Sequence, residues 1–201
     1  AEWTPHTWLS RVQVRQRVHH KRTFLFLEQM ILKHNAHERA IGIVELADGV
    51  DFHFKSKSHG NRMVDFVQNN FVCKFTKSSQ LVTHDPRNNS HHYKHTTILE
   101  LAPICRDDLV LLPPKCAKEI GGIGPIVLVY KVTTSVHIVD IHTMRTHEID
   151  QTKYWRYTFL ACAGRERLTE FVVLNLEDLD QADFSVSRAT IKQKMKMVKY
   201  R

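Results

Sequence analysis

Residues 11–34 change their hydrophobic period part-way along, and this change limits the possible folds more than any other stretch of the chain. In residues 11–18, valines alternate with arginine or glutamine, which is typical of a strand with one buried face. In residues 24–32, apolar side chains recur at helical spacing, which predicts a helix with Thr23 as its N-cap. The lysine and histidine that follow suit its negative C-terminal end. The segment therefore predicts a strand that leads directly into a helix.

The outer face of this segment is basic. Cations and histidines lie between residues 11 and 22 with no carboxylate among them, so we expect this ridge to contact a polyanion. The alternative, a solvated basic face without such a partner, stays open. Just before the ridge, Trp3 and Trp8 are interpreted as a hydrophobic staple onto the first helix in preference to a base-stacking pair. The predicted RNA-binding residues of the ridge are Arg11, Arg15, Arg17, His19, His20, Lys21 and Arg22.

The composition supports a polyanionic partner. The 201 residues carry a formal charge of +8 and include 14 histidines, and the pI is about 9.4. Such a surface favours nucleic acid first and an acidic membrane second. Since no apolar run reaches membrane-spanning length, no membrane partner is expected. The chain is long enough for two small domains, and a hydrophobic content of 42% suffices for buried cores.

Metal binding and catalysis are both poorly supported by the sequence. The four cysteines are far apart and form no C-x-x-C pair, so buried free thiols in a reducing compartment are expected. Adjacent histidines such as His19 and His20 point to opposite faces of a strand and would chelate one ion poorly. No catalytic constellation stands out, and the stretch GGIGP lacks the Gly-Lys-Ser/Thr ending of a phosphate loop. The chain is therefore predicted to be neither an enzyme nor a metal protein.

The first half of the chain predicts the order β-α-β-β-α-β with one further strand. Asp48-Gly49 lies between two alternating runs, which is a strong signal for a hairpin with positive φ in its turn. The helix that follows has Ser56 or Ser58 as its predicted cap. We expect a sheet with helices on one face and the other face free.

Residues 84–95, HDPRNNSHHYKH, are predicted to form a loop between the last two strands of this half. Asp-Pro and Asn-Asn pairs favour turns. Histidines can also hydrogen-bond riboses or stack on unpaired bases, so the loop is a second candidate for RNA contact. Its predicted RNA-binding residues are His91, His92, Lys94 and His95.

From Pro103 onward, short strands separated by turns predict a small β barrel of SH3-like or OB-like type. A short helix over residues 114–120 begins with proline and is followed by glycines, as helix ends often are. The tail from Arg188 to Arg201 carries six cations and no acid, and its spacing fits a helix or a strand. Its predicted RNA-binding residues are Lys192, Lys194 and Lys196.

Several stretches carry a family resemblance: VQVRQRVHHKRTFLFLEQMILKH with ELADGVDFHFKSKSHGNRMVDFVQ, then HHYKHTTILELAPICRDDLVLLPP, VTTSVHIVDIHTMRTHEID and EFVVLNLE. Over residues 8–178 they resemble the eukaryotic nuclear-export adaptor of the large (60S) ribosomal subunit, the nonsense-mediated-decay protein three family. The resemblance implies an α+β fold. Residues 1–102 would form a sheet-and-helix domain like a large-subunit ribosomal protein, residues 103–178 a β-barrel domain like translation factor five-A, and residues 179–201 a basic tail or the start of a further β unit.

The resemblance also implies a function. Family members are non-enzymatic adaptors that bind rRNA and ribosomal proteins on the joint face of the pre-60S subunit, across the tRNA sites and toward the L1 stalk. Such an adaptor blocks premature translation, links the subunit to the exportin through a C-terminal tail, is released with the help of a GTPase, and shuttles between nucleus and cytoplasm. This chain is interpreted as a central fragment, so the zinc sites of the family's N-terminal domain are not expected in it and no cofactor is implied. Two alternatives stay open: an accessory RNA-binding module of an rRNA-processing enzyme, and a structural ribosomal protein.

Overall fold

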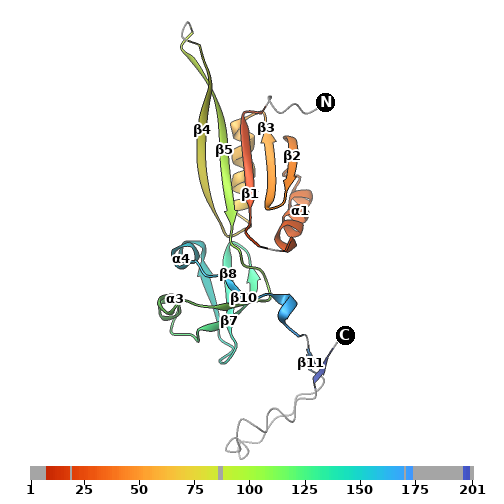
Figure 1. Ribbon diagram of the computed structural model, residues 1–201, viewed down its shortest axis with the longest axis vertical. Helices are drawn as coiled ribbons and strands as arrows, with labels where there is room; N and C mark the ends of the chain where they lie inside the picture. Colours follow the sequence, from red (N-terminus) through yellow and green to blue (C-terminus); the bar gives the residue numbers. More distant parts are fainter. Residues whose placement is uncertain (1–7, 19, 86–87, 170, 174–196, 200–201) are drawn as a thin grey trace, which may run out of the picture. The chain divides into compact units, whose positions relative to one another are not determined.

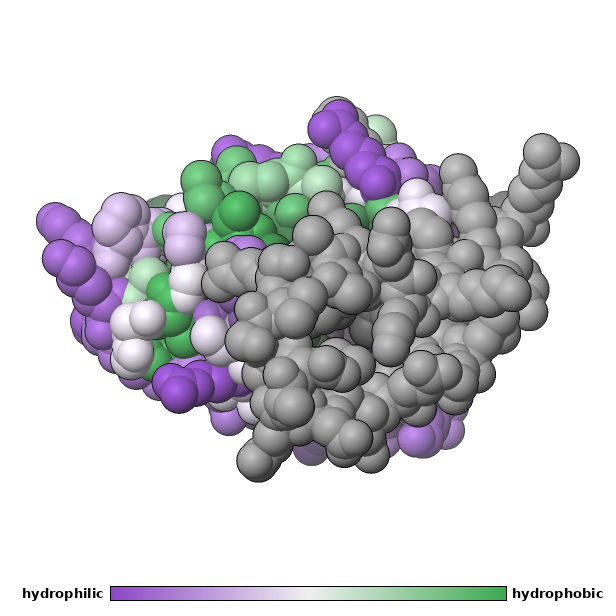
Figure 2. Space-filling view, turned by 90° about the horizontal axis from the view of Figure 1, so that it is seen from below, coloured by the Kyte–Doolittle hydropathy of each residue, from purple (hydrophilic) through white to green (hydrophobic). Residues whose placement is uncertain are grey.

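The computed structural model describes residues 8–18, 20–85, 88–169, 171–173 and 197–199. Residues 1–162 form one compact unit and residues 163–201 another. Two five-stranded sheets with separate hydrophobic cores account for most of the described chain (Figure 1). Seen from below, the described surface is largely hydrophilic and is interrupted by smaller hydrophobic areas (Figure 2). None of the described helices is long and apolar enough to cross a membrane. The predicted domain boundaries after residues 102 and 178 stay predictions.

The first sheet and its two helices occupy the first half of the chain. The strands lie in the order β2-β3-β1-β5-β4, with β1 parallel to β5 and the other neighbours antiparallel. The predicted order β-α-β-β-α-β plus a further strand is confirmed. The elements are β1 (Ser10–Arg15), α1 (Arg22–His34), β2 (Ala40–Leu46), β3 (Gly49–Phe54), α2 (Lys57–Gln68), β4 (Cys73–Asp85) and β5 (Ser90–Leu101).

Both helices cover the same face of this sheet. The core combines Val12 and Val14 of β1 with Leu27 of α1 and Met63 of α2, and all four side chains are buried. Because side chains alternate along a strand, the residues between these valines point to the opposite face. No described helix contributes to that opposite face, so the prediction of one covered and one free face is confirmed.

The helix starts agree with the prediction in α2 and differ from it in α1. The N-cap of α1 is Lys21, which makes no side-chain cap hydrogen bond, so the predicted Thr23 cap is wrong. Thr23 already lies inside the first turn, and its hydroxyl contacts Cys105 Sγ at 3.0 Å. In α2 the Ser56 hydroxyl accepts a hydrogen bond from the Ser58 amide, as predicted.

The predicted β2–β3 hairpin is confirmed, but its turn lies one residue earlier than expected. Leu46 pairs with Gly49, so Ala47 and Asp48 form the two-residue loop, and neither has a positive φ. Gly49 is required for another reason, because a Cβ atom there would collide with the backbone oxygen of Val14. The glycine thus lets β3 approach β1 closely.

The predicted loop over residues 84–95 is wrong. Strand β4 continues to Asp85 and β5 begins at Ser90, so most of the segment is paired strand. His84 lies opposite His91, and their rings stack with centroids 4.5 Å apart. Cross-strand contacts of this kind stabilise a ladder. They extend the pairing past the point where the composition alone indicated a loop.

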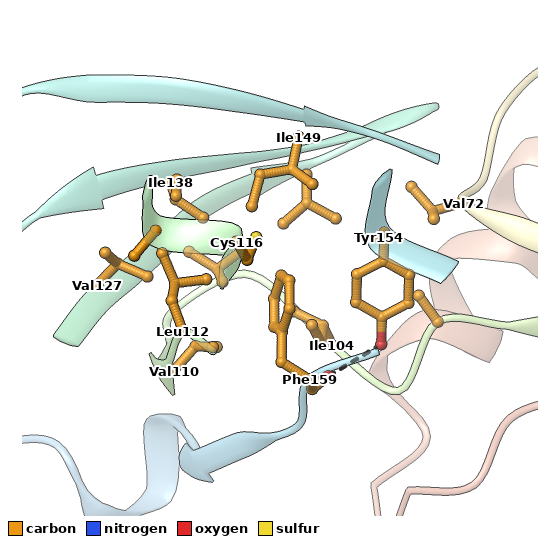
Figure 3. Close-up of a cluster of buried hydrophobic side chains, with 14 of the residues drawn as sticks. Val72, Ile104, Val110, Leu112, Cys116, Val127, Ile138, Ile149, Tyr154 and Phe159 are labelled. Atoms are coloured by element: carbon orange, nitrogen blue, oxygen red, sulfur yellow. Dashed lines mark hydrogen bonds between the residues drawn. The ribbon is translucent and has the colours of Figure 1, made fainter. Parts of the chain in front are cut away.

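The second sheet has the strand order β10-β6-β7-β8-β9. Its core consists of aliphatic side chains together with the rings of Tyr154 and Phe159, and Tyr154 lies fully buried at one side of the cluster (Figure 3). The Tyr154 hydroxyl donates a hydrogen bond to the backbone oxygen of Phe159 at 3.1 Å, and burial raises its pKa well above the ordinary value. The elements are β6 (Asp108–Leu111), α3 (Pro114–Glu119), β7 (Ile126–Val132), β8 (Ser135–Asp140), β9 (Thr146–Asp150), α4 (Gln151–Tyr157) and β10 (Ala161–Ala163).

Helix ends in this second sheet follow the predicted pattern. Helix α3 begins with Pro114 at its first position, and Gly121 and Gly122 beyond its end both have positive φ. Helix α4 was not predicted, because its aromatic residues suit a strand as well as a helix.

The unit of residues 163–201 is described only in part. A short 3-10 helix spans Arg165–Arg167, and β11 (Phe171–Val173) pairs antiparallel with β12 (Met197–Lys199). Where the tail is described it is therefore a strand. The predicted residues Lys192, Lys194 and Lys196, like His19 and Trp3, lie outside the described residues.

Candidate nucleic-acid interface

The free face of the first sheet, opposite α1 and α2, carries Arg11 and Arg15 of the predicted basic ridge, whereas Arg17, His20, Lys21 and Arg22 lie beyond the end of β1. Along β1, the side chains of this face alternate with the buried valines. The strand register places the corresponding side chains of β3, β4 and β5 on the same face, between the buried residues of those strands. Both signs of charge are present, so the ridge is not purely basic once the sheet forms. The charged and imidazole side chains of the free face are Arg11, Arg15, Asp51, His53, Lys74, Lys94 and Glu100.

Trp8 lies on this face between two cations. The Arg11 guanidinium is 5.2 Å from the centre of its ring and the Lys94 ammonium is 4.3 Å from it. The His53 ring lies beneath, 5.4 Å away between centroids, and its burial lowers its pKa. The interpretation of Trp8 as a staple onto the first helix is therefore wrong, because its ring contacts residues of β1, β3 and β5. Neither Arg11 nor Lys94 forms an ion pair with a described residue, so both charges can meet a phosphate.

Arg15 is not the solvent-facing cation that the ridge interpretation required. Its Nη2 donates to Asp51 Oδ1 at 2.6 Å, its Nε lies 3.6 Å from Asp48, and its side chain is only 18% exposed. Asp51 comes from β3, 36 residues away along the chain. The segment around Arg15 contains no acid, so only the strand pairing brings this carboxylate into contact.

Arg17 stays exposed but has a carboxylate neighbour. Its side chain is 87% exposed, and its Nε lies 3.7 Å from Glu100 Oε1. Lys74 approaches the other oxygen of the same carboxylate at 3.0 Å. With one carboxylate between two cations, this area keeps a net positive charge. Both ion pairs are solvated and therefore weak.

Arg22, at the start of α1, contacts the segment before β6. Its guanidinium donates to Asp108 Oδ1 at 3.2 Å and to the backbone oxygen of Arg106 at 3.1 Å. Arg22 therefore has a structural contact, whereas Lys21 is exposed and forms no ion pair with the described residues.

His20, Cys105 and Asp108 bring three possible metal-ligand atoms within 4.8 Å of one another. The donor set does not suit a cation, because Asp108 already accepts from Arg22 and from the Cys105 amide, the latter at 2.8 Å. Burial also raises the pKa of the Cys105 thiol, which disfavours the thiolate that a metal requires. We therefore interpret Cys105 and Asp108 as partners in a hydrogen-bonded contact with Arg22 and Thr23, whereas the buried His20 Nδ1 has no hydrogen-bond partner among the described residues.

The histidine candidates of the β4–β5 hairpin do not form one cluster. Since β5 alternates, His91 and His95 point to one face, with Tyr93 between them, whereas His92 and Lys94 point to the other. Lys94 alone among the four predicted residues reaches Trp8. Sequence reasoning considered Trp8 for base stacking but preferred the staple, and it did not single out His53, although the alternation of β3 places His53 opposite the core.

Family models match both sheets. The model described as NMD3, second domain, matches residues 7–101, and the model described as NMD3 SH3 domain matches residues 104–152. The chain belongs to the NMD3 family. The SH3-like alternative is thereby favoured for the second sheet, while the likeness of the first sheet to a ribosomal protein stays a prediction.

Curated relatives agree with this membership, and each has the name 60S ribosomal export protein NMD3. The relative from Dictyostelium discoideum is 44% identical over 170 residues, and the one from Saccharomyces cerevisiae is 44% identical over 175 residues. The human relative is 36% identical over 178 residues. These matches cover 85% to 87% of this chain but only 32% to 35% of the relatives. The chain thus spans about a third of the length of the relatives it matches.

Proposed function

We propose that this chain is a ribosome-contacting part of a non-enzymatic 60S export adaptor. The observation that carries the proposal is the match of two consecutive NMD3 domains, together with relatives that share the name 60S ribosomal export protein. In this proposal the adaptor binds rRNA on the joint face of the pre-60S subunit, across the tRNA sites and near the L1 stalk. It excludes translation there and joins the subunit to the exportin, before a GTPase helps to release it. Such a cycle requires shuttling between nucleus and cytoplasm.

Within this chain, we assign the rRNA contact to the area around Trp8 on the free face. Arg11 and Lys94 supply charges that no described carboxylate neutralises, and both cations lie over the Trp8 ring, so the two charges are held close together. Arg17, which stays exposed, extends the positive area along the chain. Arg15 and Arg22 act mainly in the fold, because their guanidinium groups are bound to Asp51 and Asp108.

The test is co-sedimentation of the chain with purified large and small ribosomal subunits across a salt series. We expect selective binding to the large subunit that persists near physiological salt. Each phosphate contact contributes about one unit to the slope of log K against log salt concentration, so Arg11→Gln with Lys94→Gln should lower that slope by about two.

The matched control is Arg62→Gln with Lys115→Gln, which removes the same charge from exposed positions on α2 and α3. This control should leave the salt slope almost unchanged. Equal binding of the parent chain to both subunits, lost steeply as salt rises, would contradict the adaptor proposal. An equal effect of the two double variants would contradict the assignment to the Trp8 area alone.

A further inference from the structure

An apolar groove lies between α1 and the β2–β3 hairpin, away from the free face. Its volume is about 420 Å³, and its floor is made by the buried residues Leu27, Ile31 and Phe52. Figure 1 shows α1 beside this end of the sheet. The groove therefore opens where the helix-covered face reaches the edge of the sheet.

The rim of the groove exposes large hydrophobic side chains. Leu25, Ile43 and Leu46 all line it, and these residues are between 44% and 59% exposed. Isolated exposed leucines are common on protein surfaces, but several around one concave apolar site mark an interaction surface. The rim thus points to a partner with apolar side chains.

One side of the groove is an unpaired strand edge. Strand β2 ends the sheet order and, among the described strands, pairs only with β3. Edge strands are usually protected by charged residues or proline. In β2, the sequence AIGIVEL offers a single charge, that of Glu45. Its outer backbone N–H and C=O groups are suited to pairing with an added strand.

The charge of the groove contrasts with that of the chain as a whole. Glu28 and Glu45 line it, both are exposed, and no ion pair among the described residues includes either of them. The basic or titratable residues of the lining are Lys21, His20 and His37. Apart from the two histidines, two carboxylates oppose one ammonium group. The groove therefore disfavours a phosphate backbone and favours a cationic partner.

We propose that this groove binds an extended, basic protein segment that pairs with the outer edge of β2. The side chains on one face of the segment enter the groove, where apolar ones contact its floor and lysine or arginine side chains meet Glu28 and Glu45. Strand addition supplies affinity through the backbone, while the groove and the carboxylates supply specificity. That the segment belongs to a ribosomal protein rests on the proposed function, whereas its chemistry rests on the groove alone. The domain then contacts RNA on its free face and protein at the β2 edge.

The test uses an array of overlapping synthetic peptides that tiles the proteins of the large ribosomal subunit. The parent chain should select basic peptides in which apolar residues alternate, and the affinity for the strongest of them is then measured by fluorescence anisotropy. Ile43→Glu places a charge at the rim and should weaken that affinity about tenfold or more, since a lost apolar contact is worth at least that factor. Glu45→Lys should weaken it mainly at low salt.

The matched control is Leu81→Glu, because Leu81 is 47% exposed on β4 and does not line the groove. It should bind the selected peptides as the parent does. Hydrogen exchange should slow in β2 and α1 when peptide is added and stay unchanged in β4. The inference is overturned if no peptide is selected, if acidic or uncharged apolar peptides bind equally well, or if Ile43→Glu binds like the parent.

This test is separate from that of the proposed function. The array contains neither RNA nor assembled subunits, so selection of basic peptides stands even if the chain fails to sediment with large subunits. Conversely, large-subunit binding that depends on Arg11 and Lys94, without any peptide selection, leaves the adaptor proposal intact and removes the groove from it.

Discussion

Replacing Arg15 with methionine tests whether this cation serves the fold or the RNA contact. The change keeps a long side chain but leaves Asp51, which is 6% exposed, without its guanidinium partner. Gln13 Nε2 still donates to the same carboxylate at 3.0 Å, so Asp51 keeps one hydrogen bond. The substitution therefore removes the neutralising charge while the buried carboxylate remains.

The unfolding free energy that Arg15→Met removes should lie between the values for a fully buried and an exposed ion pair. Breaking a fully buried ion pair costs about 3–5 kcal/mol, and breaking an exposed one costs about 0–1 kcal/mol. The Arg15 and Asp51 side chains are 18% and 9% exposed, which is closer to the buried limit. After discounting for the solvent that reaches Arg15, we expect the free energy of unfolding to fall by about 2–3 kcal/mol.

Urea denaturation followed by far-UV circular dichroism measures this loss, and Arg17→Met is the matched control. Arg17 is 87% exposed and 3.7 Å from its carboxylate, so its replacement should cost less than about 0.5 kcal/mol. Combining Arg15→Met with Asp51→Asn should recover part of the loss, because the unpaired charge is gone. Similar destabilisation by the two methionine variants, or additive effects in the double variant, would refute a buried structural pair.

Three further predictions concern single side chains. Gly60→Ala should destabilise the chain by about 1–3 kcal/mol, although alanine favours helices, because its Cβ would collide with the Ser10 hydroxyl. Urea denaturation should show a smaller loss of unfolding free energy when Ser10→Ala is also present. Tyr154→Phe should lower the free energy of unfolding by about 1–2 kcal/mol, measured in the same way, because the buried Phe159 oxygen loses its donor; an unchanged midpoint would contradict this. Hydrogen bonds from its neighbours lower the pKa of Asp140 to about 2, so its contribution to stability is present above the unfolded-state pKa and is lost as the pH falls toward 2. Asp140→Asn should therefore make acid denaturation less steep in that pH window. An equally steep acid transition would contradict this reasoning.

Local patterns in the sequence predict the elements of the first sheet well. The alternation of residues 11–18 and the helical spacing that follows it depend on neighbouring residues only, so β1 and α1 are both recovered. The β2–β3 hairpin is recovered for the same reason. The predicted turn is one residue too late, because Gly49 is required by the close approach of β3 to the backbone of β1 and not by the turn.

Contacts between residues far apart in the sequence determine the features of the fold and the site that local patterns do not predict. The hairpin of β4 and β5 is longer than predicted because cross-strand pairs such as His84 and His91 continue the ladder. The position of Trp8 depends on three strands that meet only in the folded sheet. The partners of Arg15 and Arg22 are likewise remote in sequence, so counting charges within one segment overstated the free basic surface.

The pairing of charges on the free face narrows the RNA contact that the proposed function requires. A formal charge of +8 would attract any polyanion, but a charge already bound to a carboxylate releases few counterions when RNA approaches. Arg15 is therefore a poor contributor to the salt slope, whereas Arg11 and Lys94 should contribute almost fully. Since both cations lie over one indole ring, the two charges act at the same point. It follows that binding should respond strongly to the position of a removed charge and only weakly to the total, which distinguishes a defined docking site from a general polycation.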